Sequence, residues 1–526
     1  MAQIQQRLLA VPLLVALAAP CAERKFFPDD PVWKEPAPLP IAHIAPRNLN
    51  AIHDFLHQCG RPERRLPSPA GAINTLGEVP DSAWFTNRHG RRRMTPEELK
   101  RGQGADRIPV PPYTVIAART NAITEDFRFL DSKGRLYFVR PDPFSNPELT
   151  TGADIIGSRF FHVLGYNTRE RYLIYPRRSD LRIQPGALIT GLANRRHRME
   201  ESHLDRLLRL IAKRKDGTWR LLAAYLETGE AEGPFRFEGT RTDDPNDLVP
   251  HENRRDLRGL HVICAWLNHT QISALNTRDL TATENGVRFL KHYLVNFTSV
   301  LGSDADRVKD ARLGYDYVLP TRKSAFGRMA SFGLHFAPWE LADFPGDRAL
   351  GRIEAQVFDP ETWKPAYPNP AFLSRDPVDE YWGAKLVMSL SRADIRTIVD
   401  TAEFSRKETA ELLTSTLADR RDKIGRTYFR KVLALDNFRL EGGEIRFDDL
   451  AVVHRFAEPR QYSYAWHTFD NLTGGSTAIQ GATSAQWPRL QPGAYAMVRI
   501  AAIGDESKYV TVYLSGAKVI GLDRAW

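Results

Sequence analysis

Four polar residues near the middle of the chain have a spacing that could position groups for phosphate chemistry. His269, Gln271 and Asn276 follow an apolar helical pattern over 260–267, and Asn296 follows a strand-like run. Transfer of a phosphoryl group needs one carboxylate to accept a hydroxyl proton and another to hold Mg²⁺ against the phosphates. Gln271 and Asn296 are neutral amides, so neither can act as a base or add negative charge.

A purely structural interpretation of these positions stays open. Asn268, His269, Gln271 and Asn276 are equally explained as polar loop and cap residues after a buried helix, because short polar side chains bond readily to nearby backbone. Spacing alone does not decide between a chemical site and such a loop. The neighbouring elements therefore matter.

Two charged residues upstream are candidates for an ion pair between a strand and the helix that follows it. Arg140 ends a strand-like run and Asp154 lies one turn into a helical pattern, so the two can pair. The alternative is an ordinary surface ion pair, which contributes about 0–1 kcal/mol. The loop 117–124 has no glycine, so its side chains would obstruct a phosphate. The patterns predict strands over 113–116, 127–130, 136–140 and 172–175, a turn at 131–134, and a helix over 148–164 ended by Gly165.

The second half of the chain reads as helices followed by a β-rich unit. The charged run 420–424 is interpreted as a solvated helix face, and the polar loop 235–253 leads into the central helix. The last ninety or so residues alternate short strands with Gly, Pro and Asn turns, typical of a small β-sandwich or meander. We expect helices over 199–214, 379–390, 391–401 and 406–433, and strands over 219–227, 462–468, 495–503, 509–514 and 518–522.

The segment 23–105 is rich in proline and turn formers, which predicts a strap around a domain rather than a domain of its own. Trp84 and Phe85 would be its anchors. Helices are predicted over 49–58 and from the cap Thr95 onward.

Composition limits the function classes. The chain has 526 residues, 42% of them apolar and 10% aromatic, which indicates a folded protein of several domains. The net charge of +9 is mild for this length, and the densest basic run, 88–93, is interpreted as a solvated loop. Zinc-spaced cysteines and a basic-aromatic module are absent from the sequence, which argues against a nucleic-acid partner.

The first residues have the pattern of an export signal. Arg7 precedes an apolar run over 8–19 that is too short to span a bilayer, and small residues follow. The mature chain is expected outside the cytoplasm, periplasmic or extracellular. The small residues at 16–18 or at 20–22 are the predicted cleavage site. The alternative is that Cys21 accepts a lipid and anchors the chain as a lipoprotein. Cys264 is predicted to be a small core residue.

With these residues laid out, the chain resembles a family of exported bacterial proteins with a protein-kinase-like core. That core is similar to the HipA-like and spore-coat kinase groups. The resemblance covers much of 27–435, through the stretches 79–87, 147–165, 243–251, 265–277, 292–303, 358–372 and 420–425.

The resemblance implies an α+β, two-lobed kinase-like core with a small β-rich lobe and a larger helical lobe. It also implies that Arg140, Asp154, Gln271 and Asn296 stand where the family tends to have Lys, Glu, Asp and a second Asp, and that Asn276 is kept. The predicted units are a signal peptide (1–22), a wrapping segment (23–105), the small lobe (106–240), the helical lobe (241–435) and a β-rich domain (436–526).

Three functional hypotheses follow. The first is a pseudokinase that acts as a binding or scaffolding module for an envelope or extracellular protein, without a confident catalytic residue or metal site. Its nucleotide-binding positions would be Arg140, Asp154, Asn276 and Asn296, with ATP held with weak or no Mg²⁺ dependence. The second is an active atypical phosphotransferase that uses other carboxylates. For this second hypothesis the carboxylates considered are Asp279, Asp304 and Asp306. The third hypothesis is an envelope structural or binding protein unrelated to kinases.

Overall fold

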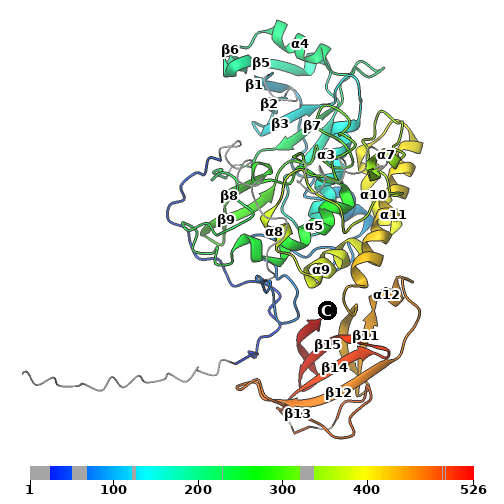
Figure 1. Cartoon of the computed structure of the whole chain (residues 1–526). Helices are drawn as coiled ribbons and strands as arrows, with labels where there is room; N and C mark the ends of the chain where they lie inside the picture. Colours follow the sequence, from blue (N-terminus) through cyan, green and yellow to red (C-terminus); the bar gives the residue numbers. More distant parts are fainter. Residues whose placement is uncertain are drawn as a thin grey trace, which may run out of the picture.

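The protein has an α+β fold in which a mixed sheet and a group of helices form two lobes, with a β-rich unit at the C-terminal end (Figure 1). The structure is a computed structural model that describes residues 24–49, 68–120, 126–227, 229–319, 337–488, 490–491 and 493–526. The predicted export signal, and nearly all of the predicted helix over 49–58, lie outside these residues. Within them, no helix combines the length and apolar character needed to span a bilayer.

The small lobe is built on a seven-stranded sheet with the strand order β4-β7-β3-β2-β1-β5-β6. Neighbouring strands are antiparallel except β1 and β5, which run parallel. All five strands predicted in this region are confirmed, with small shifts at their ends. The strands are β1 (Tyr113–Arg119), β2 (Asp126–Leu130), β3 (Leu136–Pro141), β4 (Arg171–Ile174), β5 (Leu181–Thr190), β6 (Arg196–Arg198) and β7 (Leu221–Tyr225).

Helix α3 (Leu149–Val163) carries Asp154 and packs against β3, β4 and β7. The chain turns sharply after it at Gly165, whose φ is 115°. A Cβ at Gly165 would lie 2.1 Å from the ring of Phe85. Gly165 therefore ends the helix as predicted, and the buried ring of Phe85 fills the space that a side chain would need.

The helical lobe is centred on α5 (Arg255–Leu267), every residue of which is buried, including the free thiol Cys264. Arg420 corrects one prediction. It is not on a solvated face but 2% exposed, and it donates hydrogen bonds to the carbonyls of Ala265 (2.6 Å) and Trp266 (2.8 Å). These carbonyls end α5, where a cation complements the helix dipole. Around α5 lie α8 (Pro370–Leu373), α9 (Pro377–Met388), α10 (Arg392–Val399) and α11 (Lys407–Phe429).

A β-hairpin follows the loop after α5. Strands β8 (Thr277–Glu284) and β9 (Val287–Leu294) are antiparallel and joined at Asn285 and Gly286, which both have positive φ. The predicted strand run 293–295 is only the end of β9, and β8 was not predicted. The two ends of the hairpin bring Asn276 and Asn296 within hydrogen-bonding distance of each other.

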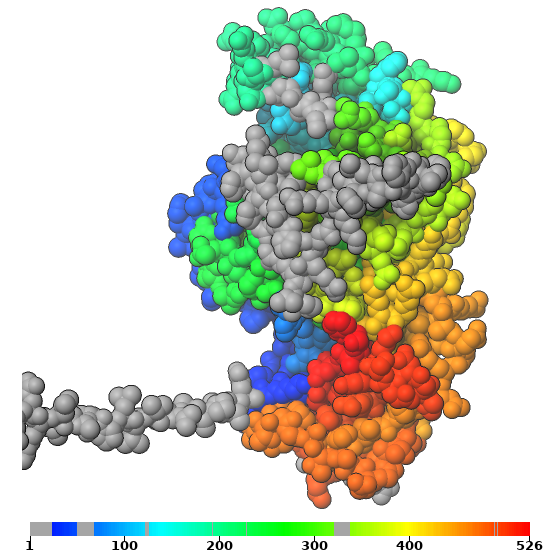
Figure 2. Space-filling view, in the orientation of Figure 1, coloured from blue at the N-terminus to red at the C-terminus, as the bar shows by residue number. Residues whose placement is uncertain are grey.

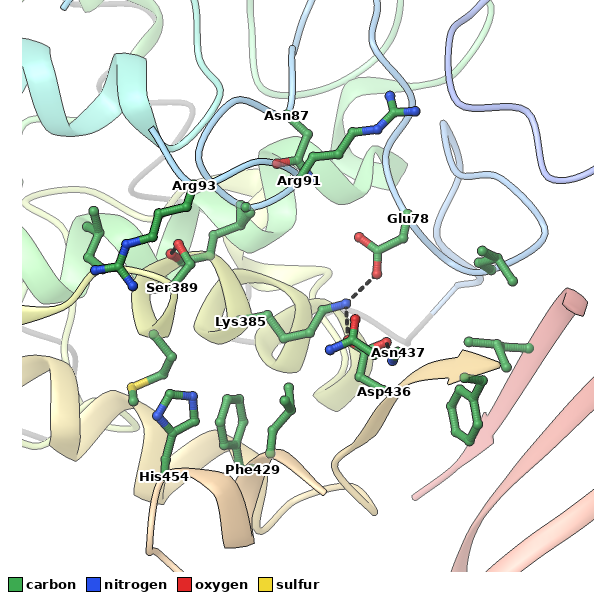
Figure 3. Close-up of a pocket in the computed structure, with 18 of the residues that line it drawn as sticks. Glu78, Asn87, Arg91, Arg93, Lys385, Ser389, Phe429, Asp436, Asn437 and His454 are labelled. Atoms are coloured by element: carbon green, nitrogen blue, oxygen red, sulfur yellow. Dashed lines mark hydrogen bonds and ion pairs between the residues drawn. The ribbon is translucent and has the colours of Figure 1, made fainter. Parts of the chain in front are cut away.

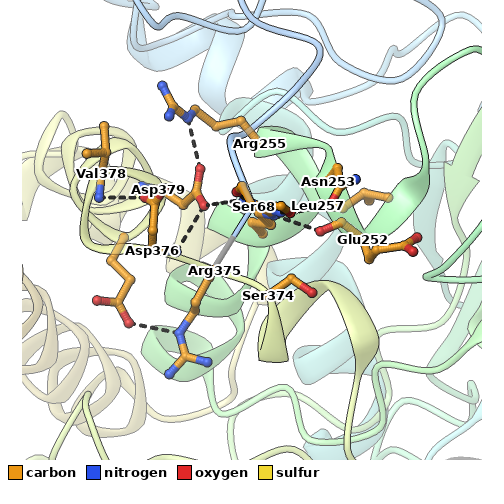
Figure 4. A network of polar contacts seen from close by, with 12 residues as sticks. Ser68, Glu252, Asn253, Arg255, Leu257, Ser374, Arg375, Asp376, Val378 and Asp379 are labelled. Carbon is orange, nitrogen blue, oxygen red and sulfur yellow. Dashed lines mark hydrogen bonds and ion pairs between the residues drawn. The ribbon is translucent and has the colours of Figure 1, made fainter. Parts of the chain in front are cut away.

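The N-terminal segment straps the core and reaches the C-terminal unit, as Figure 2 shows for the blue atoms between the two. Trp84 anchors it by stacking on His292, with ring centroids 3.5 Å apart. The buried Asp379 on α9 binds Arg255 (2.9 Å) and Arg258 (3.3 Å) of α5, and Arg258 in turn donates to Ser68 of the strap (Figure 4). Charged groups thus tie the strap, α5 and α9 together.

The C-terminal unit is a five-stranded antiparallel sheet with the order β13-β12-β14-β15-β16, plus the hairpin β10-β11. The predicted strands of this unit are confirmed, and the sheet is a meander from β14 to β16. Lys25 and Phe26 of the strap pack on it. Its strands are β10 (Leu435–Glu441), β11 (Glu444–Asp449), β12 (Tyr462–Phe469), β13 (Ser476–Ala478), β14 (Tyr495–Ala502), β15 (Asp505–Ser515) and β16 (Lys518–Ala525); the remaining helices are α2 (Pro96–Arg101), α4 (Glu201–Arg209), α7 (Pro338–Leu341) and α12 (Leu450–Val453).

Candidate functional site

Arg140 and Asp154 meet at the base of the small lobe, where β3 and α3 come together. Nη1 of Arg140 lies 3.5 Å from Oδ2 of Asp154, and Asp154 is 3% exposed. Arg171, at the start of β4, places Nε 2.6 Å from Oδ1 of the same carboxylate. This is a buried triad of two cations and one anion, not the surface ion pair that the sequence also allowed. Burial lowers the pKa of Arg140, and Asp154 partly offsets that effect.

The amides of the second lobe continue this network. Arg140 donates to Oδ1 of Asn296 (3.0 Å), and Nδ2 of Asn296 donates to Oδ1 of Asn276 (3.0 Å). Nδ2 of Asn276 donates to the backbone carbonyl of Gln271 (2.5 Å). Thr298 also donates its hydroxyl to Oδ1 of Asn296 (2.9 Å). Five positions from three separate segments, namely β3, the loop after α5 and the loop after β9, therefore form one continuous chain of contacts.

One carboxylate among those considered is part of this network. Nε2 of Gln271 donates to Oδ1 of Asp304 (2.6 Å), so the side chain of Gln271 faces an acid. Asp306 lies two residues further on and is partly exposed. Asp279 is elsewhere: it is fully buried on β8 and paired with Arg241 (2.9 Å) and His292 (2.7 Å). Its interactions explain it as a structural residue.

Lys309 holds together two loops that carry residues of the site. It is fully buried, and Nζ donates to the carbonyls of Asn268 (2.7 Å) and Ser299 (2.6 Å), which ties the loop after α5 to the loop after β9. Burial lowers the pKa of Lys309 to about 7, although Asp304 favours the charged form. Burial and the nearby Lys309 lower the pKa of His269 to about 3, so His269 is a neutral donor or acceptor beside Ser299.

The arrangement fits Mg²⁺ poorly. A magnesium ligand must present a free oxygen, and charged oxygens are preferred. Oδ1 of Asn296 already accepts from Arg140 and Thr298, and Oδ1 of Asn276 accepts from Asn296. The guanidinium of Arg140 therefore takes the oxygen that a metal would need. The residues that the structure describes also contain no group of three or more His, Cys, Asp or Glu that could hold a metal ion.

The structure brings the five predicted residues together, with two neighbours that the sequence did not predict. Arg140, Asp154, Gln271, Asn276 and Asn296 come together, while the loop 117–124 is described only as far as residue 120. The missed residues are Arg171 and Lys309. A basic residue that opens a buried strand, as at the start of β4, is the signal that could have pointed to Arg171.

The comparisons with solved structures return protein kinases. The crystal structure of a Helicobacter pylori proinflammatory kinase, CtkA, is similar with a TM-score of 0.30 and 12% identity, over 59% of this chain and 93% of that chain. The crystal structure of the Golgi casein kinase is similar with a TM-score of 0.24 and 9% identity, over 64% of this chain and 75% of that chain. The same kinase with Mn/ADP bound gives a TM-score of 0.26 and 7% identity, over 63% and 73%. No protein-family profile and no curated protein matches the chain.

Proposed function

We propose that this protein is an exported pseudokinase: a kinase-like scaffold that binds or organises an envelope or extracellular protein and does not transfer phosphate. The observation that carries the proposal is the closed amide network of Asn276 and Asn296 with Arg140. Its oxygens accept hydrogen bonds from the protein itself.

The chemistry of these groups supports the proposal. An amide at position 271 cannot accept a proton from a hydroxyl, and loss of a general base alone costs about 10²–10⁴ in rate. An amide at position 296 supplies no negative charge to a metal. The cation at Arg140 is fixed by Asp154 and Asn296. Any nucleotide that binds would therefore meet a protein cation rather than Mg²⁺.

The test compares nucleotide binding by the wild-type protein and by a variant with the acids restored, Gln271→Asp with Asn296→Asp. A ligand at about 100 times its Kd stabilises a protein by about 2.7 kcal/mol. We expect the wild-type unfolding midpoint with ATP to be the same in Mg²⁺ and in EDTA. The double variant should gain a Mg²⁺-dependent increase.

The matched control is Asn285→Asp, an exposed position in the β8–β9 turn, which should gain nothing. A wild-type protein that is stabilised by ATP only with Mg²⁺ contradicts the proposal. So does a double variant that folds but gains no metal dependence.

A second candidate function rests on Asp304. Its carboxylate lies 2.6 Å from Nε2 of Gln271, so an acid is present beside the position where the base is missing. An atypical phosphotransferase could use it to accept a proton. Transfer of radiolabelled phosphate from ATP to the protein or to casein, lost in Asp304→Asn and kept in Asp306→Asn, would establish this function and exclude the first.

Export and attachment are part of the proposal and rest on the sequence over 2–22. The protein is periplasmic or extracellular, and Cys21 is the point at which a lipid anchor would be attached. Mass spectrometry of the protein from a bacterial host distinguishes a cleaved N-terminus from a lipidated Cys21. An uncleaved chain in the cytoplasm contradicts export.

A further inference from the structure

The C-terminal unit holds the side chain of Phe26 in an aromatic socket on one face of its sheet. Phe26 is only 2% exposed, and its ring centroid lies 5.0 Å from that of Tyr513 and 6.0 Å, edge to face, from that of Phe469. Ring pairs at these spacings and tilts attract each other beyond the effect of burial. The socket consists of Phe469, Asn471, Tyr513, Ile520, Gly521 and Asp523.

Gly521 provides the space for this ring. It pairs with Tyr513 across β15 and β16, so the two positions are neighbours on the same face of the sheet. A Cβ at Gly521 would lie 2.3 Å from Cε1 of Phe26. A glycine inside a strand often marks a place where another part of a protein approaches closely. Phe26 therefore occupies a gap that the sheet itself leaves open.

The socket also binds the main chain of its occupant. The N–H of Phe26 donates to Oδ1 of Asn471 (2.8 Å), and Nδ2 of Asn471 donates to the carbonyl of Phe26 (2.8 Å). The N–H of Lys25 donates to the carbonyl of Asn471 (3.2 Å). Because these three bonds use backbone groups, they would form with many sequences. Main-chain bonds that supply affinity and side-chain pockets that supply specificity are the usual division in peptide recognition.

A basic residue before the aromatic one meets an acid of the socket. Nζ of Lys25 lies 2.6 Å from Oδ2 of Asp523 and 3.9 Å from the centroid of the Tyr513 ring. Tyr513 donates its hydroxyl to the same carboxylate oxygen (2.7 Å). The following residue, Phe27, is 53% exposed and lies outside the socket. The element that the socket selects is therefore a basic residue followed by one aromatic residue.

The rest of the strap is fastened without this socket. Nζ of Lys385 on α9 donates to the carboxylates of Glu78 in the strap and Asp436 on β10 (2.6 Å to Asp436), as the dashed lines in Figure 3 show. These bonds tie the strap, α9 and the C-terminal unit together. Lys25 and Phe26 can therefore leave the socket while the strap stays in place, and local opening of a chain costs least at such end segments.

We propose that the socket is a peptide-binding site, occupied here by Lys25 and Phe26 of the same chain, which accepts from another protein a segment in which Lys or Arg precedes Phe. Asp523 complements the charge of the basic residue, the gap at Gly521 takes the ring, and Asn471 binds the main chain. The chain's own segment is then a tethered competitor that a partner must displace. The socket belongs to the C-terminal unit, so it does not depend on the pseudokinase proposal.

The test uses the full chain with Phe26→Ala, which empties the socket, and a peptide with the sequence of residues 24–30, acetylated and labelled with fluorescein at its C-terminus. Fluorescence anisotropy measures the binding. We expect saturable binding to the variant, about tenfold or more tighter than to the wild-type protein, in which the tethered segment competes. Alanine in place of the first Phe of the peptide should weaken binding about tenfold or more, because that ring is the buried anchor. Alanine in place of its second Phe, the matched control, should leave binding unchanged, and Glu in place of its Lys should weaken it severalfold.

Gly521→Ala, added to Phe26→Ala, should abolish binding, because the new methyl takes the place of the ring. Gly475→Ala, in the exposed turn between β12 and β13, should leave binding unchanged. The peptide substitutions leave the protein unaltered and keep the test valid if Gly521→Ala disturbs the sheet. Equal binding by wild type and Phe26→Ala, equal binding of the two alanine peptides, or absence of saturation would each overturn the proposal. Wild-type dimers that dissociate in Phe26→Ala, observed by sedimentation velocity, would assign the socket to a second copy of the chain and would also overturn it.

Discussion

The buried triad of Arg140, Asp154 and Arg171 makes a quantitative prediction, because its two cations share one carboxylate. Asp154→Ala removes the only acid that contacts either guanidinium within the triad. Arg140→Ala leaves Asp154 paired with Arg171 at 2.6 Å, and Asn296 keeps its bond from Thr298. Arg140 and Asp154 contact each other, yet their substitutions should lower the free energy of unfolding by different amounts.

The magnitudes follow from what each variant leaves buried. Removal of one partner of a buried ion pair typically costs about 3–5 kcal/mol, because the other charge stays without compensation. Asp154→Ala should fall in this range, since both guanidinium groups are buried to 16% exposure or less in their side chains. Arg140→Ala removes charged hydrogen bonds but leaves the acid paired, so about 1–3 kcal/mol is expected.

Equilibrium unfolding in urea, followed by tryptophan fluorescence, measures both values. The control is Asp205→Ala, whose carboxylate is 2.6 Å from Arg178 but 47% exposed, so its loss should cost about 1 kcal/mol or less. If Arg140→Ala is as costly as Asp154→Ala, or if neither exceeds the control, Asp154 is not shared as the structure indicates and the reasoning is refuted.

Three further predictions concern single residues. Lys309 has a folded-state pKa of about 7 against its ordinary 10.5, so between pH 7 and 10.5 the unfolded chain binds more protons than the folded one. The free energy of unfolding should therefore rise with pH in this range by up to about 1.4 kcal/mol per pH unit. Lys309→Met should flatten that rise, as measured by urea titrations at several pH values. Arg420→Met should cost about 3 kcal/mol or more, because three backbone carbonyls lose a buried donor, whereas the exposed Arg430→Met on the same segment should cost little in the same assay. Gly165→Ala should lower the free energy of unfolding by about 2–4 kcal/mol, since the new methyl meets the Phe85 ring at a positive φ; a near-neutral result contradicts the packing described here.

Much of the small lobe could be predicted because its signals are local. Strands β1 to β3 have alternating apolar residues and a turn at Asp131–Gly134, and the helical spacing in α3 is continuous until Gly165. Strand β5 was missed because Pro185 and Gly186 interrupt it and much of it is exposed. The pattern of apolar residues along the sequence does not predict a strand that is stabilised mainly by pairing with its neighbour.

The hairpin β8–β9 was missed for a different reason. Asn285-Gly286 is a strong hairpin signal, but the flanking residues 277–284 are polar and read as a loop. Asp279 and His292 pair across this hairpin and are buried, and the charge of Asp279 is compensated by His292 and by Arg241, which lies 38 positions earlier. A charged residue whose partner is distant in sequence cannot be assigned to the core from its own neighbourhood.

The same limit explains Arg420. Its run of charges looks solvated, and the carbonyls that it binds belong to α5, more than 150 positions earlier. The residues of the candidate site could be grouped from the sequence because they follow the order of the family that the chain resembles, and the structure brings them together. The order of the residues along the chain does not reveal that the amide oxygens of Asn276 and Asn296 already accept hydrogen bonds from other side chains.

The contacts of Lys25 and Phe26 with the C-terminal sheet can form only late in synthesis. Lys25 bonds to Asp523, and Phe26 exchanges hydrogen bonds with Asn471. The partners are separated by 498 and 445 positions, so at about 5–20 residues per second Lys25 and Phe26 wait roughly half a minute to two minutes for them. During that interval Lys25 and Phe26 have no docking surface, so a protease or a chaperone can reach them before their own sheet has formed. The contacts of Lys25 and Phe26 therefore cannot form until the strands of the C-terminal sheet have been made.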